Sequence, residues 1–227
     1  MTAVTHKSSS ETQTAKAKVL LVDDHPVVRQ GLGQLINEEP DLSIVGEAED
    51  FQQALAAIDT ANPDVAIVDI SLKDRSGIEL IKEIRAKRPE LPILVLSMHD
   101  ESLHAERVLR AGALGYVMKQ EPQETVMTAI RRVLKGETYL SEKMAAKLLR
   151  SFTGNRGKAD APPLERLSDR ELQVFRMIGQ GHNVKDIAEA LFLSPKTVET
   201  HKEHIKQKLN LASSNDLLRY AIEARLP

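Results

Sequence analysis

Acidic side chains come directly after two apolar runs in the first half of the chain. Asp23 and Asp24 follow the run at 19–22, and Asp69 lies near the carboxyl end of the run at 64–70. If both runs are strands of an open parallel sheet, these carboxylates meet at the edge where such sheets bind ligands. Three carboxylates in one crevice repel one another unless a hard cation is bound, and Mg²⁺ prefers a few carboxylates plus water. The pattern therefore predicts a divalent-cation site that holds Mg²⁺.

A hydroxyl and an ammonium are expected in the same crevice. Ser97 ends the run at 92–97, and Lys119 follows the run at 115–118. This set of groups suits a phosphoryl group, because the cation and Lys119 neutralise its oxygens while a carboxylate attacks in line. Asp69 is the candidate nucleophile. Any one of these side chains alone could be a helix cap or turn former, but five of them at the ends of four strands favour a site.

Short β-branched runs alternate with amphipathic stretches between residues 18 and 134, so the hydrophobic period switches repeatedly between strand and helix. The expected strands are 19–22, 42–48, 64–70, 92–97 and 115–118, and the expected helices are 27–38, 51–61, 77–87, 102–111 and 122–134. Continuous apolar runs suit strands covered on both faces, whereas the alternating run at 42–48 suits an edge. We expect an α/β fold of (βα)5 type, a doubly wound, flavodoxin-like parallel sheet.

The second half of the chain is organised differently. A short helix-compatible stretch at 141–149 precedes SFTGNRGKADAPP, whose glycines, asparagine and paired prolines do not pack as a regular element. Ser168 and Glu171 then form the pattern of a capping box that begins a helix, and three more helical stretches follow. We expect the following organisation: a disordered tail at 1–17, the α/β domain at 18–134, a linker at 135–163 and a small all-α four-helix domain at 164–227.

Composition excludes several classes of protein. The 227 residues are 41% hydrophobic and 28% charged, as in a globular protein, and include no cysteine, so thiolate metal sites and cysteine nucleophiles are excluded. No apolar run approaches the roughly 20 residues that cross a bilayer, and residues 1–17 lack the apolar core of a secretion signal. We therefore expect a cytoplasmic protein with no membrane partner. The shift from 13 basic and 20 acidic residues at 18–134 to 10 and 9 at 164–227 slightly favours nucleic acid binding by the second half.

Two helical stretches at 183–192 and 195–210, joined by a short break, have the length of a helix-turn-helix. Apolar residues recur on both at helical spacing and should pack the two helices together: Ile187, Ala188, Leu191, Val198, Ile205 and Leu209. The outward stripe of the second helix would then comprise Lys196, Glu199, Thr200, Glu203 and Gln207. An ordinary helical hairpin with a solvated face stays open as an alternative. The glutamates repel phosphate but can accept from cytosine, so base preference is open.

The segments LLVDDHPVVRQGL, DVAIVDISLKDRSGIEL, ILVLSMHDE and AGALGYVMK resemble the receiver domain of two-component response regulators, over residues 18–134. The resemblance implies that Asp69 is the phosphoacceptor and that Lys119 contacts the phosphoryl group. The implied ligands of Mg²⁺ are Asp23, Asp24, Asp69 and the backbone carbonyl of Ser71. Ser97 matches the switch hydroxyl and Tyr116 the switch aromatic residue.

One position departs from the receiver pattern. Gln120 follows Lys119, where the pattern often has proline. A cis peptide before a residue other than proline costs about 2.5–4 kcal/mol, so the geometry of the loop after Lys119 is left open. His99 and His104 are expected to be surface residues without a role.

The segments LSDRELQVFRMIGQG, KDIAEALFLSPKTVETH and IKQKLNLASSNDLLRYAI resemble the LuxR-type helix-turn-helix of the NarL/FixJ class, over about residues 164–225. The resemblance implies contacts with double-stranded promoter DNA by Lys196, Thr197, Thr200, His201, Lys202 and Lys206. His204 stands where family members often have asparagine. The last helix resembles the family's dimerisation helix through Leu217, Leu218, Ala221 and Ile222, with simple core packing as the alternative.

The two resemblances together imply a response regulator of the NarL/FixJ type. A sensor histidine kinase would phosphorylate Asp69, which would recruit Ser97 and Lys119, rotate Tyr116 inward and let the protein bind promoter DNA as a homodimer, with RNA polymerase as a further partner. Such a protein is not a turnover enzyme. A phosphohydrolase with Asp69 as covalent intermediate is the enzyme alternative, disfavoured because the sequence offers no dedicated base. A DNA-binding protein with an inert receiver, controlled by a protein partner, is the other.

Overall fold

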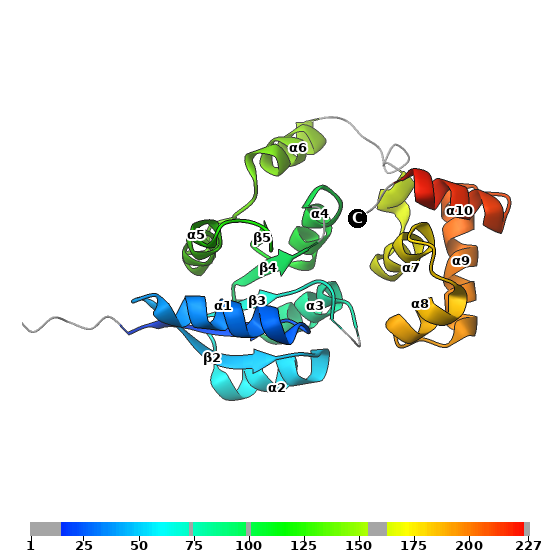
Figure 1. Ribbon diagram of the computed structural model, residues 1–227. Helices are drawn as coiled ribbons and strands as arrows, with labels where there is room; N and C mark the ends of the chain where they lie inside the picture. Colours follow the sequence, from blue (N-terminus) through cyan, green and yellow to red (C-terminus); the bar gives the residue numbers. More distant parts are fainter. Residues whose placement is uncertain (1–14, 73–74, 99–100, 154–162, 225–227) are drawn as a thin grey trace, which may run out of the picture.

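The structure is a computed structural model, and it describes residues 15–72, 75–98, 101–153 and 163–224. It contains a parallel sheet with helices on both faces and, at the C-terminal end of the chain, a group of packed helices (Figure 1). The expected tail at 1–17 lies outside the described residues except for its last three, and so does His99.

The sheet has five parallel strands in the order β2-β1-β3-β4-β5. Their bounds are β1 Ala17–Val22, β2 Leu42–Ala48, β3 Val65–Val68, β4 Ile93–Ser97 and β5 Gly115–Met118. The order reverses between β1 and β3, as in a doubly wound sheet, and β2 lies at an edge, so both expectations are confirmed. Strand β3 ends at Val68, which leaves Asp69 in the loop at the carboxyl edge.

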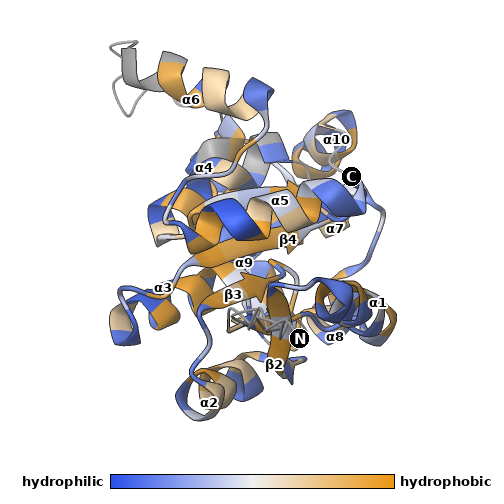
Figure 2. Ribbon diagram, turned by 90° about the vertical axis from the view of Figure 1, so that its left-hand side faces the viewer, coloured by the Kyte–Doolittle hydropathy of each residue, from blue (hydrophilic) through white to orange (hydrophobic). Residues whose placement is uncertain are grey.

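Helices cover both faces of this sheet, and alternate residues of β1 supply the two cores. Leu20 and Val22 pack in one hydrophobic cluster with α2, α3 and α4, whereas Val19 and Leu21 pack in the other with α1 and α5. The bounds are α1 Pro26–Glu38, α2 Phe51–Ala61, α3 Gly77–Lys87, α4 Glu101–Ala111 and α5 Gln123–Leu134. The strands are strongly hydrophobic and the helices carry hydrophilic residues on their outer sides (Figure 2). This three-layer arrangement confirms the predicted fold class.

The segment after α5, which was expected to be a linker, packs in part on the sheet domain. Tyr139 extends the β5 edge, because its carbonyl accepts from the N–H of Tyr116 at 2.9 Å and its N–H donates to Leu114 at 3.0 Å. Helix α6, Glu142–Thr153, is longer than the expected 141–149. Met144 is only 2% exposed and joins the core cluster that contains Tyr116. The start of the expected linker therefore packs on the sheet domain.

The C-terminal part consists of a 3₁₀ helix and four α-helices around one hydrophobic cluster. Their bounds are η2 Pro163–Arg166, α7 Asp169–Gly179, α8 Val184–Ala190, α9 Pro195–Leu209 and α10 Ser214–Glu223. The capping box of Ser168 and Glu171 begins α7 as expected, and a second one, formed by Asn183 and Asp186, begins α8. Gly179 allows α7 to approach α10, since a Cβ there would lie 2.6 Å from the carbonyl oxygen of Ala221.

A side chain of α4 joins the two parts of the molecule. Arg107 donates to the carboxylate of Asp169 at 3.1 Å and to the carbonyl of Leu164 at 2.9 Å. Another residue of α4, His104, is only 9% exposed. The expectation that His104 lies on the surface is therefore wrong, because its side of α4 packs inward with Ala105 and Val108.

Candidate functional site

Two carboxylates and one ammonium meet at the carboxyl edge of the sheet. Nζ of Lys119, in the loop after β5, lies 2.8 Å from Oδ2 of Asp69 and 2.5 Å from Oδ2 of Asp23. The three side chains are nearly inaccessible to solvent, with exposed fractions of 2 to 5%. The structure thus brings together three residues from the ends of β1, β3 and β5, as the sequence predicted.

The backbone fixes the loop that carries Asp23. Its N–H donates to Ala48 at 3.0 Å, and its carbonyl accepts from Nη1 of Arg29 at 2.6 Å. The Asp23 carboxylate accepts from the N–H of His25 at 2.9 Å. Arg29 also pairs with Glu47 on β2 at 3.4 Å. Arg29 was not among the residues predicted for the site. Its position one turn into the helix that follows Asp23 and Asp24 could have indicated this contact.

A glycine fixes the loop that carries Asp69. Gly77, the first residue of α3, donates its N–H to Ile70 at 2.8 Å. A Cβ at this position would lie 2.0 Å from the carbonyl oxygen of Asp69, which is far inside van der Waals contact. Only glycine permits this approach, so Gly77 sets the position of Asp69. No separate feature of the sequence indicates this requirement.

Burial and neighbouring charges raise the pKa values of both Asp69 and Lys119. Desolvation raises the pKa of Asp69 above its usual value and exceeds the opposing attraction of Lys119. Burial acts to lower the pKa of Lys119, but the charges of Asp69 and Asp23 outweigh it, and the pKa of this ammonium is raised. The pocket therefore holds a permanent positive charge beside a carboxylate that is costly to ionise.

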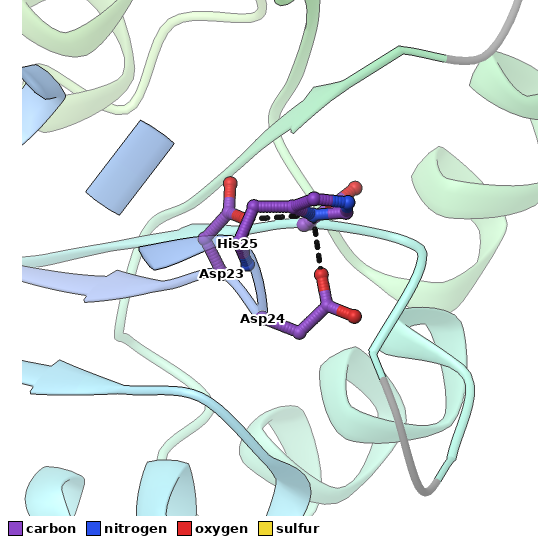
Figure 3. A group of neighbouring side chains, drawn as sticks. Asp23, Asp24 and His25 are labelled. Atoms are coloured by element: carbon purple, nitrogen blue, oxygen red, sulfur yellow. Dashed lines mark hydrogen bonds and ion pairs between the residues drawn. The ribbon is translucent and has the colours of Figure 1, made fainter. Parts of the chain in front are cut away.

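Four residues at this edge have the donor atoms of a metal site. Ligand atoms of Asp23, Asp24, His25 and Asp69 all lie within 4.8 Å of one another. The imidazole of His25 lies beside the carboxylates of both Asp23 and Asp24 (Figure 3). Carboxylate oxygens are ligands that divalent cations such as Mg²⁺ accept, so the donor set fits a divalent cation. Ser71, the remaining expected ligand, donates its N–H to Oδ1 of Asp69 at 3.2 Å.

The two expected switch residues are both buried. Ser97 ends β4 and is 0% exposed, and its carbonyl accepts from the N–H of Lys119 at 2.9 Å. Tyr116 is 1% exposed and packs in the core cluster with Ala105 and Met144. Tyr116 was expected to turn inward when the protein is phosphorylated. In this structure its side chain is already inward. The described residues contain no cis peptide, so the bond between Lys119 and Gln120 is trans.

A second group of predicted residues lies on α9. Its outward stripe is exposed as expected, and it consists of Lys196, Glu199, Thr200, Glu203 and Gln207. Two lysines beside the stripe pair with glutamates one turn earlier: Lys202 with Glu199 at 2.9 Å and Lys206 with Glu203 at 2.8 Å. The hydroxyls of Thr197 and Thr200 interact with Ser194 and the Lys196 carbonyl, respectively. The helix therefore presents a row of charges that are paired within the helix itself.

His201 differs from the other expected DNA contacts. Its Nδ1 is buried and has no hydrogen-bond partner among the described residues, and burial lowers the pKa of its imidazole. Glu171, 3% exposed, lies near this part of α9 and accepts from Nζ of Lys208 at 2.6 Å. The inward placement of Nδ1 leaves His201 with a smaller accessible surface than Lys196 or Thr200.

Only half of the predicted dimer surface on α10 is accessible. Leu217 and Ala221 are 1% and 3% exposed and belong to the core of the helical part, so the expectation that they contact a partner is corrected. Leu218 and Ile222 are 41% and 54% exposed. Apolar residues occur on two faces of α10, and the sequence pattern did not separate them.

Comparison with known proteins agrees with both regions. The family of response regulator receiver domains matches residues 19–131, and the luxR family of bacterial regulatory proteins matches residues 165–221. The oxygen regulatory protein NreC of Staphylococcus carnosus is 39% identical over 213 residues, which are 92% of this chain and 98% of that protein. Among solved structures, a LuxR-family two-component response regulator from Aurantimonas is 33% identical, with a TM-score of 0.57 over 62% of this chain and 100% of that one.

A DNA complex is also among the similar structures. RcsB from Salmonella enterica serovar Typhimurium, bound to promoter rprA in the presence of the phosphomimetic BeF₃⁻, is 28% identical, with a TM-score of 0.62 over 91% of this chain and 98% of that chain. A parallel sheet with a buried acidic pocket, followed by a helix-turn-helix, defines a receiver joined to a LuxR-type output domain. The chain belongs to the response regulators of two-component systems that carry this DNA-binding domain. None of the helices in the described ranges is long and apolar enough to cross a membrane.

Proposed function

We propose that Asp69 is the residue at which this regulator receives its signal. A histidine kinase would present a phosphohistidine, an oxygen of Asp69 would attack the phosphorus in line, and the P–N bond would break as the acyl phosphate forms. The observation that carries this proposal is the ammonium of Lys119, held 2.8 Å from Asp69 and 2.5 Å from Asp23 in a buried pocket. Lys119 supplies a fixed positive charge where the phosphoryl oxygens would gather negative charge.

Mg²⁺ is the proposed cofactor of this step. Asp23, Asp24, Asp69 and the backbone carbonyl of Ser71 would hold it, and when bound it would neutralise charge on the phosphoryl group. Three carboxylates and one ammonium leave the ionised pocket with a net charge of −2, which matches a divalent cation. Asp69 and Lys119 are almost wholly buried, so water has little access to the phosphorylated carboxyl, and this supports a slowly reversible switch over a turnover enzyme.

The proposed route to the output domain runs through α4. Lys119 is hydrogen-bonded to the end of β4 at Ser97, and α4 follows β4 in the chain. A change around Asp69 that displaces α4 would pull Arg107 away from Asp169 and Leu164 and free the C-terminal helices. Arg107→Ala should then raise DNA affinity before any phosphorylation. Unchanged affinity of Arg107→Ala would remove this route.

The output domain is proposed to bind promoter DNA through α9. Lys196, Thr200 and Gln207 lie on its exposed stripe, and Lys202 and Lys206 flank it. We propose dimerisation through the exposed Leu218 and Ile222 of α10, which is supported by RcsB structures in which dimers are bound to DNA. The proposed division is a receiver at 18–134, a linker at 135–163 and a DNA-binding domain at 164–227. A cytoplasmic location and contact with RNA polymerase complete the proposal.

The test is DNA affinity with and without a phosphodonor. A duplex is selected from a random library by the full-length protein in the presence of acetyl phosphate and Mg²⁺, and its binding is measured by fluorescence anisotropy. The affinity of the wild type should increase when the donor is added, and the affinity of Asp69→Ala should not change. An equal increase in Asp69→Ala would overturn the assignment of Asp69.

A further inference from the structure

An imidazole with no role so far lies at the mouth of the acidic pocket. Nδ1 of His25 is 2.6 Å from Oδ1 of Asp24 and 3.4 Å from Oδ1 of Asp23. Its ligand atom is within 4.8 Å of those of Asp23, Asp24 and Asp69. A cation held by these carboxylates would therefore lie within reach of a nitrogen donor.

The backbone around His25 explains why its side chain turns to the carboxylates. His25 is the N-cap residue of α1, with φ −90° and ψ 108°, but its side chain makes no capping hydrogen bond. The backbone N–H of His25 donates to Oδ1 of Asp23, which fixes the start of the side chain beside the pocket.

Solvent reaches this side of the pocket. The side chain of His25 is 61% exposed and that of Asp24 is 16% exposed, whereas those of Asp23 and Asp69 are 2% and 3% exposed. A hydrated cation would therefore meet His25 and Asp24 before it reaches the buried carboxylates. His25 lies at the mouth of the site, on the path by which a cation enters.

We propose that His25 donates Nδ1 to the divalent cation of this pocket, which makes the site a mixed nitrogen and oxygen site. Imidazole favours first-row transition metals such as Co²⁺ and Ni²⁺, whereas Mg²⁺ prefers oxygen ligands. The ligand assigned to the pocket is therefore a borderline divalent metal ion. The ratio of its affinity to that of Mg²⁺ should be higher here than at a site with oxygen ligands alone. The inference rests on the proposed function, because the same carboxylates hold the cation there.

The test measures metal selectivity and a spectroscopic signature in the full-length protein. Free Mn²⁺ is counted by electron paramagnetic resonance, and Co²⁺ and Mg²⁺ are then titrated as competitors. His25→Ala should lose at least about tenfold in Co²⁺ affinity, with a much smaller change for Mg²⁺. The wild type loaded with Mn²⁺ should show ¹⁴N coupling in pulsed spectra, and His25→Ala should lose this coupling.

Control variants separate His25 from other histidines and from effects on folding. His182→Ala removes an exposed imidazole from the C-terminal part and should behave as the wild type. His99→Ala should also keep the ¹⁴N coupling. His25→Asn replaces the nitrogen donor by an amide oxygen at an N-cap position that suits asparagine, so it should bind Mg²⁺ as the wild type does and lose the preference for Co²⁺.

Two results would overturn the inference and leave the proposed function intact. One is an equal ratio of Co²⁺ to Mg²⁺ affinity in the wild type and His25→Ala. The other is ¹⁴N coupling that persists in His25→Ala and disappears in His99→Ala. A different result overturns both proposals: Mn²⁺ and Mg²⁺ affinities that are unchanged by Asp23→Asn, because the carboxylate pocket would then not be the metal site.

Discussion

Charged side chains are arranged in opposite ways in the receiver pocket and on helix α9. Asp23, Asp69 and Lys119 are at most 5% exposed, and they follow three different strands. Lys202 and Lys206 of α9 pair with glutamates on the same helix, and those glutamates are more than half exposed. The pocket is fixed by the fold before a ligand arrives, whereas the pairs on α9 can exchange partners when a phosphate backbone approaches.

This difference decides how each region should respond to substitution. Removing Lys119, the one cation that Asp23 and Asp69 share, leaves two buried carboxylates without compensation, which is strongly destabilising. Exposed pairs within a helix contribute only a few tenths of a kcal/mol, so their loss changes binding more than stability. We therefore expect large, all-or-none effects in the pocket and graded, salt-dependent effects on α9.

The largest effect is expected for Lys119→Met, which leaves Asp23 and Asp69 buried without their common cation. The free energy of unfolding should fall by about 3–5 kcal/mol, measured by urea denaturation in the absence of divalent cations. Mg²⁺ should restore more stability to this variant than to the wild type. The same stabilisation of both proteins by Mg²⁺ would contradict the placement of the cation beside Asp23 and Asp69.

The next largest effect is expected for Gly77→Ala, whose Cβ would lie 2.0 Å from the carbonyl oxygen of Asp69. The strain should cost about 1–3 kcal/mol and displace Asp69, so phosphorylation by acetyl phosphate should be lost. Gly31→Ala is the matched control, because nothing lies within 4 Å of a Cβ at this position in α1. It should stabilise the protein by about 0.5–1 kcal/mol. A phosphorylated Gly77→Ala variant would show that the close approach is not required.

Asp69→Asn should raise the melting temperature at neutral pH, since it removes a carboxylate that is costly to ionise. Burial raises the pKa of Asp69 in the folded protein. The folded state therefore binds a proton more tightly than the unfolded state, and stability falls as the pH rises from the unfolded pKa through the folded one. The gain in melting temperature should be larger at neutral pH than below the unfolded pKa of about 3.9. A gain that does not depend on pH would contradict the raised pKa.

The smallest effect on stability is expected for the double variant Glu199→Gln, Glu203→Gln. Freed from their ion pairs, Lys202 and Lys206 should contact phosphates, so DNA affinity should increase several-fold at low salt. The slope of log affinity against log salt should steepen by about 1–2. Glu223→Gln, which removes an exposed charge from α10, is the control. If Glu223→Gln increases DNA affinity as much per removed charge as the double variant does, the ion pairs on α9 have no specific effect on DNA binding.

The sheet and most of the pocket could be predicted from the sequence, because the end of each strand fixes where the next residues lie. Apolar runs predicted five strands, and residues at the carboxyl ends of parallel strands meet at one edge. Asp23, Asp69 and Lys119 were therefore placed together without a structure. The requirement for glycine at Gly77 was not predictable, because it depends on how closely α3 approaches the Asp69 loop.

The remaining errors arose where a residue's neighbours lie on other elements. His104 is polar and was therefore expected on the surface, but it packs inward on α4. Leu217 and Ala221 share α10 with Leu218 and Ile222, and the packing of α7 and α9 against α10 decides which pair is buried. The length of α6 was underestimated because the last residues of the helix, 151–153, were assigned to the irregular segment SFTGNRGKADAPP.

The most direct test of the central claim is the intact mass of the wild type and of Asp69→Asn after incubation with acetyl phosphate and Mg²⁺. We expect one added phosphoryl group on the wild type, none on Asp69→Asn, and no wild-type adduct when Mg²⁺ is chelated before the donor is added. An adduct of equal yield on Asp69→Asn would contradict the assignment of Asp69 as phosphoacceptor, and an adduct that forms without any divalent cation would contradict the role of Mg²⁺.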